Sequence, residues 1–417
     1  MTERVLCKTL GCSRTILPST AERTGGYCIP CANRAAAEAH ARELAARRVD
    51  VDRFAGVSDV VEILRLLHKP PAPDPEKRFL PYNTPTPDVY RGLEQWDADR
   101  LVLAASTAPD FVRDVAVYLA AFSNVDLLPV QRALLAIGDP YPAAVFRAAS
   151  SPVVDRLFAL LETSIGREDA LALDHTLSAL AWARSRRVVE AMVDWSRNRP
   201  SWGTMLDIAP HEYATVAGYA IEDGVARDLI LDSPVRLVAP PDEATREPAV
   251  VFESDPRGGG CPLCARPAVS LLSMRGDALP DRFRGKVPER VPTCPDCASY
   301  GPLFVHLAAD GGWSWLPTER PPATPGASWD LAPARATFAP RAMWEAVDWC
   351  RADGLSQIGG HPSWINDPVY PRCPTCSRLM MTVAQIALED FVRHAEGIFY
   401  VHYCSGCSVA GVSYDQS

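Results

Sequence analysis

Twelve of the thirteen cysteines fall into three groups of four, and each group consists of two closely spaced pairs. Two such pairs joined by a longer loop are the ligand pattern of tetrahedral zinc. Because four thiolates close the coordination shell, no position remains for water or substrate, and we expect three structural Zn2+ ions. The alternative for each group is buried or redox-active cysteines without a metal. The groups are Cys7, Cys12, Cys28 and Cys31; Cys261, Cys264, Cys294 and Cys297; Cys373, Cys376, Cys404 and Cys407.

The spacing within the pairs has a physical reason. Two cysteines that bracket a tight turn can direct both sulfurs at one ion, while amide groups of the turn donate hydrogen bonds to the thiolates. Proline follows the first cysteine in Cys-Pro-Leu-Cys, Cys-Pro-Asp-Cys and Cys-Pro-Thr-Cys, and it stiffens the turn. We therefore expect zinc-ribbon-like sites for the second and third groups. The first group has a looser Cys7-x4-Cys12 pair. A thioredoxin-like redox pair would need a strand-to-helix context and no partner pair.

The sequence contains none of the common catalytic motifs. We find no phosphate-binding loop, no Gly-x-Ser-x-Gly elbow and no His-Glu-x-x-His helix, and the eight histidines are scattered. His211 with Glu212 could act as an acid/base pair, although a solvated pair at a turn is the favoured interpretation. His402 is interpreted as packing or as support for Cys404, and Cys350 as a small core residue on a helix. The sequence therefore predicts no catalytic residues.

One loop combines rigidity with an aromatic side chain. In the segment 358–368, Gly359 and Gly360 permit a tight turn, while Pro362 and His361 lead to Trp364. Such a segment could form a rigid recognition loop with an aromatic anchor. The alternative is that Trp364 is buried in the core of the neighbouring sheet.

The elements that must position these residues indicate an α+β fold. We expect an N-terminal zinc module, a central all-α region with HEAT-like paired helices, and a C-terminal antiparallel β-rich region with two zinc-ribbon-like sites. No clean sequence period is present, so an irregular helical bundle is the alternative. The expected segments are 1–34 (zinc module), 35–69 (helical), 70–92 (proline-rich connector), 93–232 (helical-repeat-like), 233–325 (β-rich, second zinc site) and 326–417 (third zinc site).

Composition restricts the class of protein. A chain of 417 residues with 47% hydrophobic positions can bury a sizeable core, and a formal net charge of −9 argues against a general nucleic-acid binder. The N-terminus has no apolar core of signal-peptide length, and no stretch of about 18 apolar residues predicts a membrane span. We expect a cytoplasmic protein, in which paired cysteines bind metal rather than form disulfides.

The C-terminal part resembles a known family. Gly359-Gly360-x-Pro362-x-Trp364 is followed by Tyr370-Pro371-x-Cys373-Pro374-x-Cys376 and Met380-x4-Gln385. This series resembles the C-terminal half of bacterial YwqG-like proteins, which are largely uncharacterised. It is more distantly similar to the eukaryotic programmed-cell-death-protein-two family, whose members are implicated in chaperoning a ribosomal protein. The resemblance implies an architecture, and the frequent occurrence of YwqG-like domains near toxin and immunity genes implies a toxin-neutralising role.

Three functional hypotheses follow. The leading one is an interaction or scaffold protein that binds a basic client, either as an immunity factor against a toxin or as a dedicated chaperone of a ribosomal-type protein. The alternative is a nucleic-acid-associated zinc-ribbon protein, because residues 1–48 carry eight Lys or Arg against four Asp or Glu. The third is an enzyme with an unrecognised site between the helical and β-rich halves.

Overall fold

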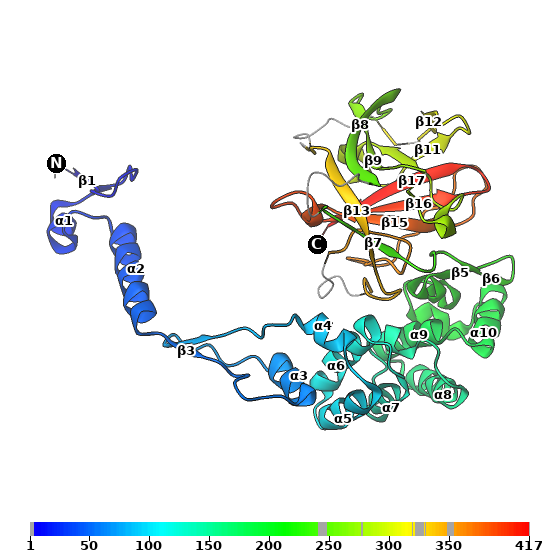
Figure 1. The fold of residues 1–417 in the computed structure, drawn as a ribbon, viewed down its shortest axis with the longest axis horizontal. Coiled ribbons are helices and arrows are strands. Elements are labelled where there is room, and N and C mark those ends of the chain that lie inside the picture. Colours follow the sequence, from blue (N-terminus) through cyan, green and yellow to red (C-terminus); the bar gives the residue numbers. More distant parts are fainter. Residues whose placement is uncertain are drawn as a thin grey trace. The chain divides into compact units, whose positions relative to one another are not determined.

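The structure is a computed structural model that describes residues 4–240, 248–276, 278–318, 320–321, 329, 331–347 and 354–416. The chain divides into two compact units, residues 1–85 and 86–417. Helices account for most elements before residue 218, and antiparallel strands for most of those after it, so the predicted α+β class is confirmed (Figure 1). Within the part of the chain described, no helix has both the length and the apolar character that a membrane span requires.

The N-terminal unit contains short strands and three helices. Its elements are β1 (Val5–Leu6), β2 (Thr15–Ile16), α1 (Pro18–Thr24), α2 (Ile29–Arg47), β3 (Val49–Val51), α3 (Val60–His68) and β4 (Lys77–Phe79). β1 and β2 form an antiparallel pair, whereas β3 and β4 pair in parallel across the loop that contains α3. The expected helical segment 35–69 is therefore interrupted by a strand. The unit ends at residue 85, so the expected connector 70–92 ends earlier than predicted.

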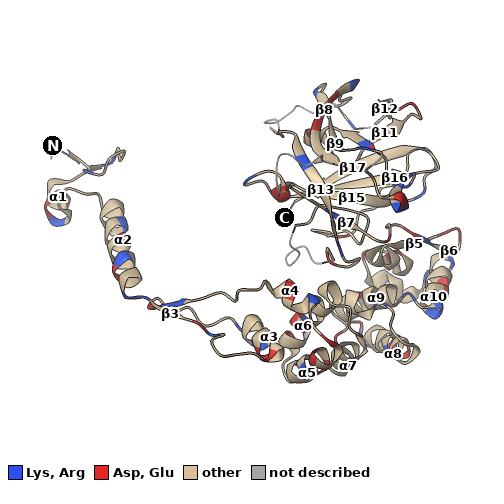
Figure 2. Ribbon diagram, in the orientation of Figure 1, with Lys and Arg blue, Asp and Glu red and all other residues tan. Residues whose placement is uncertain are grey.

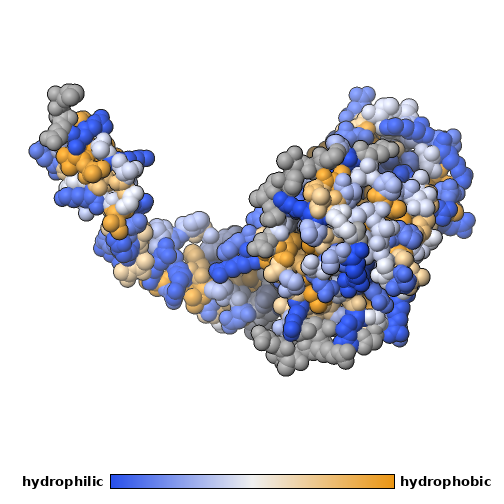
Figure 3. Space-filling view, turned by 90° about the horizontal axis from the view of Figure 1, so that it is seen from above, coloured by the Kyte–Doolittle hydropathy of each residue, from blue (hydrophilic) through white to orange (hydrophobic). Residues whose placement is uncertain are grey.

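Helix α2 is unusual because none of its nineteen residues is buried. Its alanine-rich sequence favours a helix by intrinsic propensity rather than by packing. Basic residues are distributed over α1 and α2 in Figure 2. Apolar side chains also reach the surface of this unit in Figure 3, and Leu6, Leu10 and Ile29 are more than half exposed.

The first half of the second unit is a succession of helices. From α5 to α10 each α-helix contacts the next one along the chain. The HEAT-like pairing of these helices stays a prediction, because an irregular bundle would give the same contacts. The helices are α4 (Thr86–Arg91), α5 (Gln95–Ala105), α6 (Pro109–Phe122), α7 (Leu128–Ala136), α8 (Ser151–Arg167), α9 (Ala170–Ala183) and α10 (Arg186–Arg197), with 3-10 turns η1 (Ala143–Phe146), η2 (Ser201–Met205) and η3 (Pro210–Ala217).

The helix boundaries follow from the local sequence. Proline occupies the first turn of α6, α7 and α8, where its missing N–H costs no hydrogen bond. The side chains of Asp169 and Ser185 accept hydrogen bonds from backbone N–H groups in the first turns of α9 and α10. Prolines and capping residues thus mark the first turns of these helices, which lie within the segment 93–232 that the sequence predicts to be helical.

An antiparallel sheet of eleven strands dominates the rest of the described chain. Its order is β10-β9-β8-β13-β7-β14-β15-β16-β17-β11-β12. A separate hairpin joins β5 (Tyr219–Glu222) and β6 (Val225–Asp228). The strands of the sheet are β7 (Val235–Val238), β8 (Ala249–Gly260), β9 (Pro267–Met274), β10 (Arg290–Thr293), β11 (Leu303–Leu307), β12 (Trp313–Trp315), β13 (Ala334–Pro340), β14 (Gln357–Ile358), β15 (Met381–Ala387), β16 (Ile398–Cys404) and β17 (Val409–Asp415); short helical turns are α11 (Pro295–Ala298), η4 (Asp281–Phe283) and η5 (Leu388–Asp390).

The sheet corrects the expected division at residues 325 and 326. Strand β13 lies between β8 and β7, and β11 pairs with β17 at the other side of the sheet. Strands from the expected segments 233–325 and 326–417 therefore alternate in one sheet. Their apolar side chains form one large buried cluster that includes Val251, Leu272, Phe399 and Val401. One core spanning both segments makes them a single folding unit.

Candidate functional site

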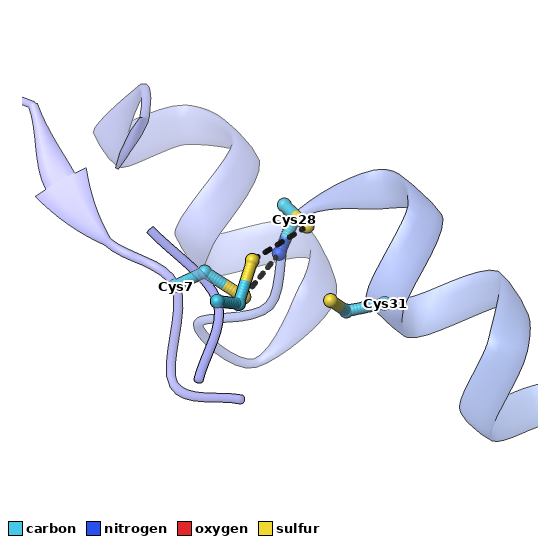
Figure 4. A group of neighbouring side chains, drawn as sticks. Cys7, Cys28 and Cys31 are labelled. Carbon is cyan, nitrogen blue, oxygen red and sulfur yellow. Dashed lines mark hydrogen bonds between the residues drawn. The ribbon is translucent and has the colours of Figure 1, made fainter. Parts of the chain in front are cut away.

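The N-terminal cysteine group joins a hairpin to the start of a helix. Cys7 follows β1, while Cys28 is the N-cap of α2 and Cys31 lies in its first turn (Figure 4). The Cys28 backbone N–H donates to the Cys7 sulfur at 3.2 Å. Backbone hydrogen bonds from Cys28 and Thr9 lower the pKa of Cys7 to about 6, which favours the thiolate that a metal requires.

The second group joins two turns at one end of the sheet. Cys261 and Cys264 follow β8, and Cys294 and Cys297 lie at the start of α11. A hydrogen bond with Cys294 lowers the pKa of Cys261 to about 5, although burial acts in the opposite direction. Arg266 Nη1 and Asp296 Oδ2 are 2.7 Å apart and link the two turns.

The third group repeats the turn of the second. Cys373 N–H donates to the Arg378 carbonyl at 2.8 Å, and Ser377 N–H donates to the Cys373 carbonyl at 2.8 Å. The second group has the same two bonds. The Cys261 N–H donates to the Arg266 carbonyl, and the Ala265 N–H donates to the Cys261 carbonyl, both at 2.8 Å. Cys404 ends β16 and Cys407 lies in the turn before β17. The sequence prediction of hairpin-borne zinc-ribbon-like turns agrees with this arrangement.

The sulfur geometry fits zinc. In each group the four sulfurs lie within 4.8 Å of one another. Sulfur pairs from different turns are separated by 3.9 Å for Cys12 and Cys28, 3.5 Å for Cys264 and Cys294, and 3.7 Å for Cys376 and Cys404. A tetrahedron with Zn–S bonds of about 2.3 Å has sulfurs about 3.8 Å apart. A disulfide would require about 2.05 Å. The three groups are therefore the ligand sets of three structural zinc ions, as the spacing predicted.

The zinc assignment gives a direct stoichiometry. We expect purified protein to contain close to three zinc ions per chain, because each of the three cysteine groups supplies a complete tetrahedral shell. Elemental analysis after exhaustive dialysis, set against the protein concentration, measures this ratio. A ratio near one would contradict at least two of the three sites.

The predicted recognition loop is corrected by its burial. Gly359, Gly360, His361 and Pro362 are buried, and Trp364 packs against Tyr370 and Tyr400 with ring centroids 5.1 and 4.5 Å away. A Cβ on Gly360, which has a φ of 77°, would come within 2.9 Å of the Pro234 side chain. The start of the loop is thus packed inside the second unit, and Trp364 is partly buried, which is closer to the alternative interpretation than to an exposed recognition loop.

The other residues named from the sequence are dispersed. His402 is fully buried and contacts Thr382 and Ser413 at 3.1 Å each, so its role is packing within the sheet. Glu212 accepts a hydrogen bond from the Ala209 N–H at the start of η3. His211 lies beside it, half-buried. Cys350 lies outside the described residues, and the described residues before it form turns rather than the expected helix.

A cavity of about 790 Å³ was not predicted from the sequence. Five carboxylates and one guanidinium, that of Arg372, line it, together with His211 and Tyr370. We call it the acidic cavity. Its carboxylates come from α9, from the segment before η3, from η3, from β5 and from the loop before Tyr370, and are those of Asp174, Asp207, Glu212, Glu222 and Asp367.

The carboxylates converge on one tyrosine. Tyr213 donates a hydrogen bond of 2.6 Å to Asp174 Oδ1. Burial raises the pKa of Tyr213 first, and the Asp174 hydrogen bond and the negative charges of Asp174, Asp207 and Asp367 raise it further. Among the described residues, Asp207 and Asp367 have no ion-pair partner. Glu222 is neutralised by Arg227 at 2.6 Å, so the negative charge that the described chain leaves without a counter-charge is that of Asp207 and Asp367.

A polar group in the same cavity also lacks a partner. His211 Nδ1 is buried and forms no hydrogen bond with any described residue. Buried polar groups normally find a partner, so groups without one are candidates for contact with a ligand. Burial lowers the pKa of His211. No local pattern reveals this cavity, and the net negative charge of the chain was the only signal.

Comparison with known proteins finds a relative of the same extent. The chain is 32% identical to the uncharacterised protein YpfL of Salmonella typhimurium over 441 aligned residues, which cover the whole of both chains. No protein-family model matches the chain. No solved structure matches it either.

Proposed function

The chain belongs to the YpfL family, and we propose that it is a zinc-stabilised interaction protein that binds a basic client protein. The client is a toxin, for which the chain serves as an immunity factor, or a ribosomal-type protein, for which it serves as a dedicated chaperone. The toxin-neutralising role rests on the resemblance to YwqG-like proteins. We place this activity in the bacterial cytoplasm, which is consistent with twelve cysteines that form no disulfide among the described residues.

The acidic cavity is the observation that carries the proposal. A cavity whose carboxylates outnumber its guanidinium groups five to one is complementary to a Lys or Arg side chain. Apolar side chains at the cavity add contact area, since Leu171 is 66% exposed and Ile208 is 42% exposed. Charged and apolar groups side by side suit a basic protein segment better than a free metal ion or an oligonucleotide.

A second candidate function rests on the N-terminal unit. Helix α2 is solvent-exposed along its whole length, and residues 1–48 carry an excess of basic residues. Such a surface supports binding of RNA or DNA through phosphate contacts. Salt-sensitive nucleic-acid binding that disappears when residues 1–48 are deleted would favour this candidate over the first.

The first candidate is tested by capture and then by charge neutralisation. Tagged protein is purified from its own cells at low salt after nuclease treatment, and a retained basic protein is identified and purified as the client. We expect Asp207→Asn with Asp367→Asn to weaken client binding at least about tenfold, because two unpaired carboxylates are neutralised. Isothermal titration calorimetry at two salt concentrations measures the affinities.

A matched variant separates the cavity from the total charge. Asp155→Asn with Glu190→Gln removes the same two charges from exposed sites on α8 and α10, where both groups pair with arginines. This control is expected to bind the client almost as tightly as the unaltered protein. Equal affinity for all three proteins, or failure to retain any basic client, would refute the proposal.

A further inference from the structure

A second cavity of the same unit contains an arginine whose charge is not neutralised. The cavity has a volume of about 810 Å³ and lies among the start of α7, the turn before α8, the end of α9 and the segment at Trp344. Arg147, in the turn between η1 and α8, lines it, as does Arg184 at the end of α9. We call it the arginine cavity. Its volume is within the range of sites for small molecules.

Arg147 lacks the carboxylate partner that Arg113 and Arg184 have. Its Nη1 atom is buried and forms no hydrogen bond with any described residue. Arg113, in contrast, binds Asp139 at 2.6 Å, and Arg184 binds Asp228 at 2.6 Å. The guanidinium carbon of Arg147 lies 5.8 Å from the ring centre of Trp344, a contact that replaces only part of the lost hydration. Burial alone lowers the pKa of Arg147 to about 10, and no carboxylate opposes that effect.

Two of the three carboxylates of this cavity have partners other than Arg147. Asp126 Oδ1 accepts a hydrogen bond of 3.0 Å from the Leu128 N–H at the start of α7. Asp228 is paired with Arg184. Asp232 is exposed to solvent. None of them contacts Arg147, so the buried cation has no counter-charge within the described chain.

We propose that the arginine cavity binds a small-molecule oxyanion whose carboxylate or phosphate pairs with the Arg147 guanidinium. A buried cation without a partner destabilises the fold, and a guanidinium presents paired N–H donors that match both oxyanions. The indoles of Trp182 and Trp344, with ring centroids 5.2 Å apart, form an apolar wall for the rest of the ligand. This site is separate from the acidic cavity and goes beyond the binding of a basic client.

The test uses three probes of stated chemistry: inorganic phosphate, adenosine monophosphate and benzoate. Calorimetry on the full chain is expected to give a dissociation constant below about 1 mM for benzoate if the ligand is a carboxylate, or for phosphate or the nucleotide if it is a phosphate. Arg147→Gln is expected to lower the affinity for the probe that binds at least about tenfold, whereas Arg113→Gln is expected to leave that affinity unchanged. Absence of binding by all three probes, or equal binding by Arg147→Gln, overturns the proposal.

Thermal unfolding without ligand provides a second readout. Arg147→Gln removes an unpaired buried charge, so its melting temperature is expected to equal or exceed that of the unaltered protein. Arg113→Gln breaks an ion pair with Asp139 and is expected to melt at a lower temperature. A lower melting temperature for Arg147→Gln would identify Arg147 as a structural residue and overturn the proposal.

Discussion

Replacing Cys294 by serine is expected to unfold much of the second unit. Cys294 is 1% exposed, lies between β10 and α11, and belongs to the large apolar cluster of the sheet. Loss of one thiolate opens the zinc shell, and structural zinc contributes roughly 10 kcal/mol or more to the folding of such sites. We therefore expect about two zinc ions per chain in any protein recovered, together with loss of the cooperative thermal transition in circular dichroism.

Cys12→Ser is the matched control for this effect. Its zinc site belongs to the N-terminal unit, whereas the sheet belongs to the second unit. The same loss of one zinc ion is therefore expected to leave the main transition of the second unit unchanged. If Cys294→Ser kept three zinc ions, or melted like the unaltered protein, the second cysteine group would not be a structural zinc site.

The zinc ligands could be predicted because their signal is local. Each pair is separated by two to four residues, and a turn of that length fixes where both sulfurs point. The helical character of residues 93–232 was predicted for a similar reason, and prolines in the first turns of α6, α7 and α8 agree with it. The hairpin around Cys404 and Cys407 is local as well, since β16 pairs with β17 from Ile398 opposite Asp415 to Cys404 opposite Val409.

The order of strands could not be predicted in this way. Strand β13 lies between β8 and β7, and the parallel pairing of β3 with β4 brings Val49 opposite Lys77. Such pairings depend on contacts between distant segments, which leave no periodic pattern in one sequence. The expected boundary at residue 325 was wrong because a change of local composition does not mark the end of a sheet.

The acidic cavity was missed for the same physical reason. Asp174, Asp207 and Asp367 are far apart in the sequence, and each alone is typical of a solvated surface. Folding places their charges around the Tyr213 hydroxyl. For the Gly359–Trp364 segment, a recognition site was predicted where the structure has a packed loop. The sequence could not decide, because glycine, proline and tryptophan suit an exposed recognition loop and a buried turn equally well. Burial against β15 and η3 decides between these interpretations.

The buried loop is expected to make the second unit sensitive to acid through His361. Its imidazole is 3% exposed, and its Nδ1 and Nε2 lie 2.9 Å from the Pro362 and Val216 carbonyl oxygens. The rings of Trp182 and Trp344 lie 4.7 and 6.0 Å from it. Burial lowers the pKa of His361 to about 4, although both carbonyl oxygens act in the opposite direction.

The sign of the effect follows from proton binding. In the unfolded chain the pKa of histidine is about 6.5, so the unfolded state binds a proton that folded His361 does not between about pH 6.5 and 4. This stabilising contribution is complete above about pH 6.5 and is lost as the pH falls towards 4, a loss of about 3 kcal/mol. Urea unfolding at several pH values measures it.

The variant His361→Gln distinguishes the contribution of His361 from other acid effects, such as the protonation of zinc ligands, which the variant and the unaltered protein share. Glutamine can still donate a hydrogen bond to the Val216 carbonyl oxygen, but it has no proton to gain in this range. The free energy of unfolding of the variant is therefore expected to fall less steeply between pH 6.5 and 4 than that of the unaltered protein, by roughly one proton. Parallel pH profiles for the two proteins would show that His361 does not link acid to the stability of this loop.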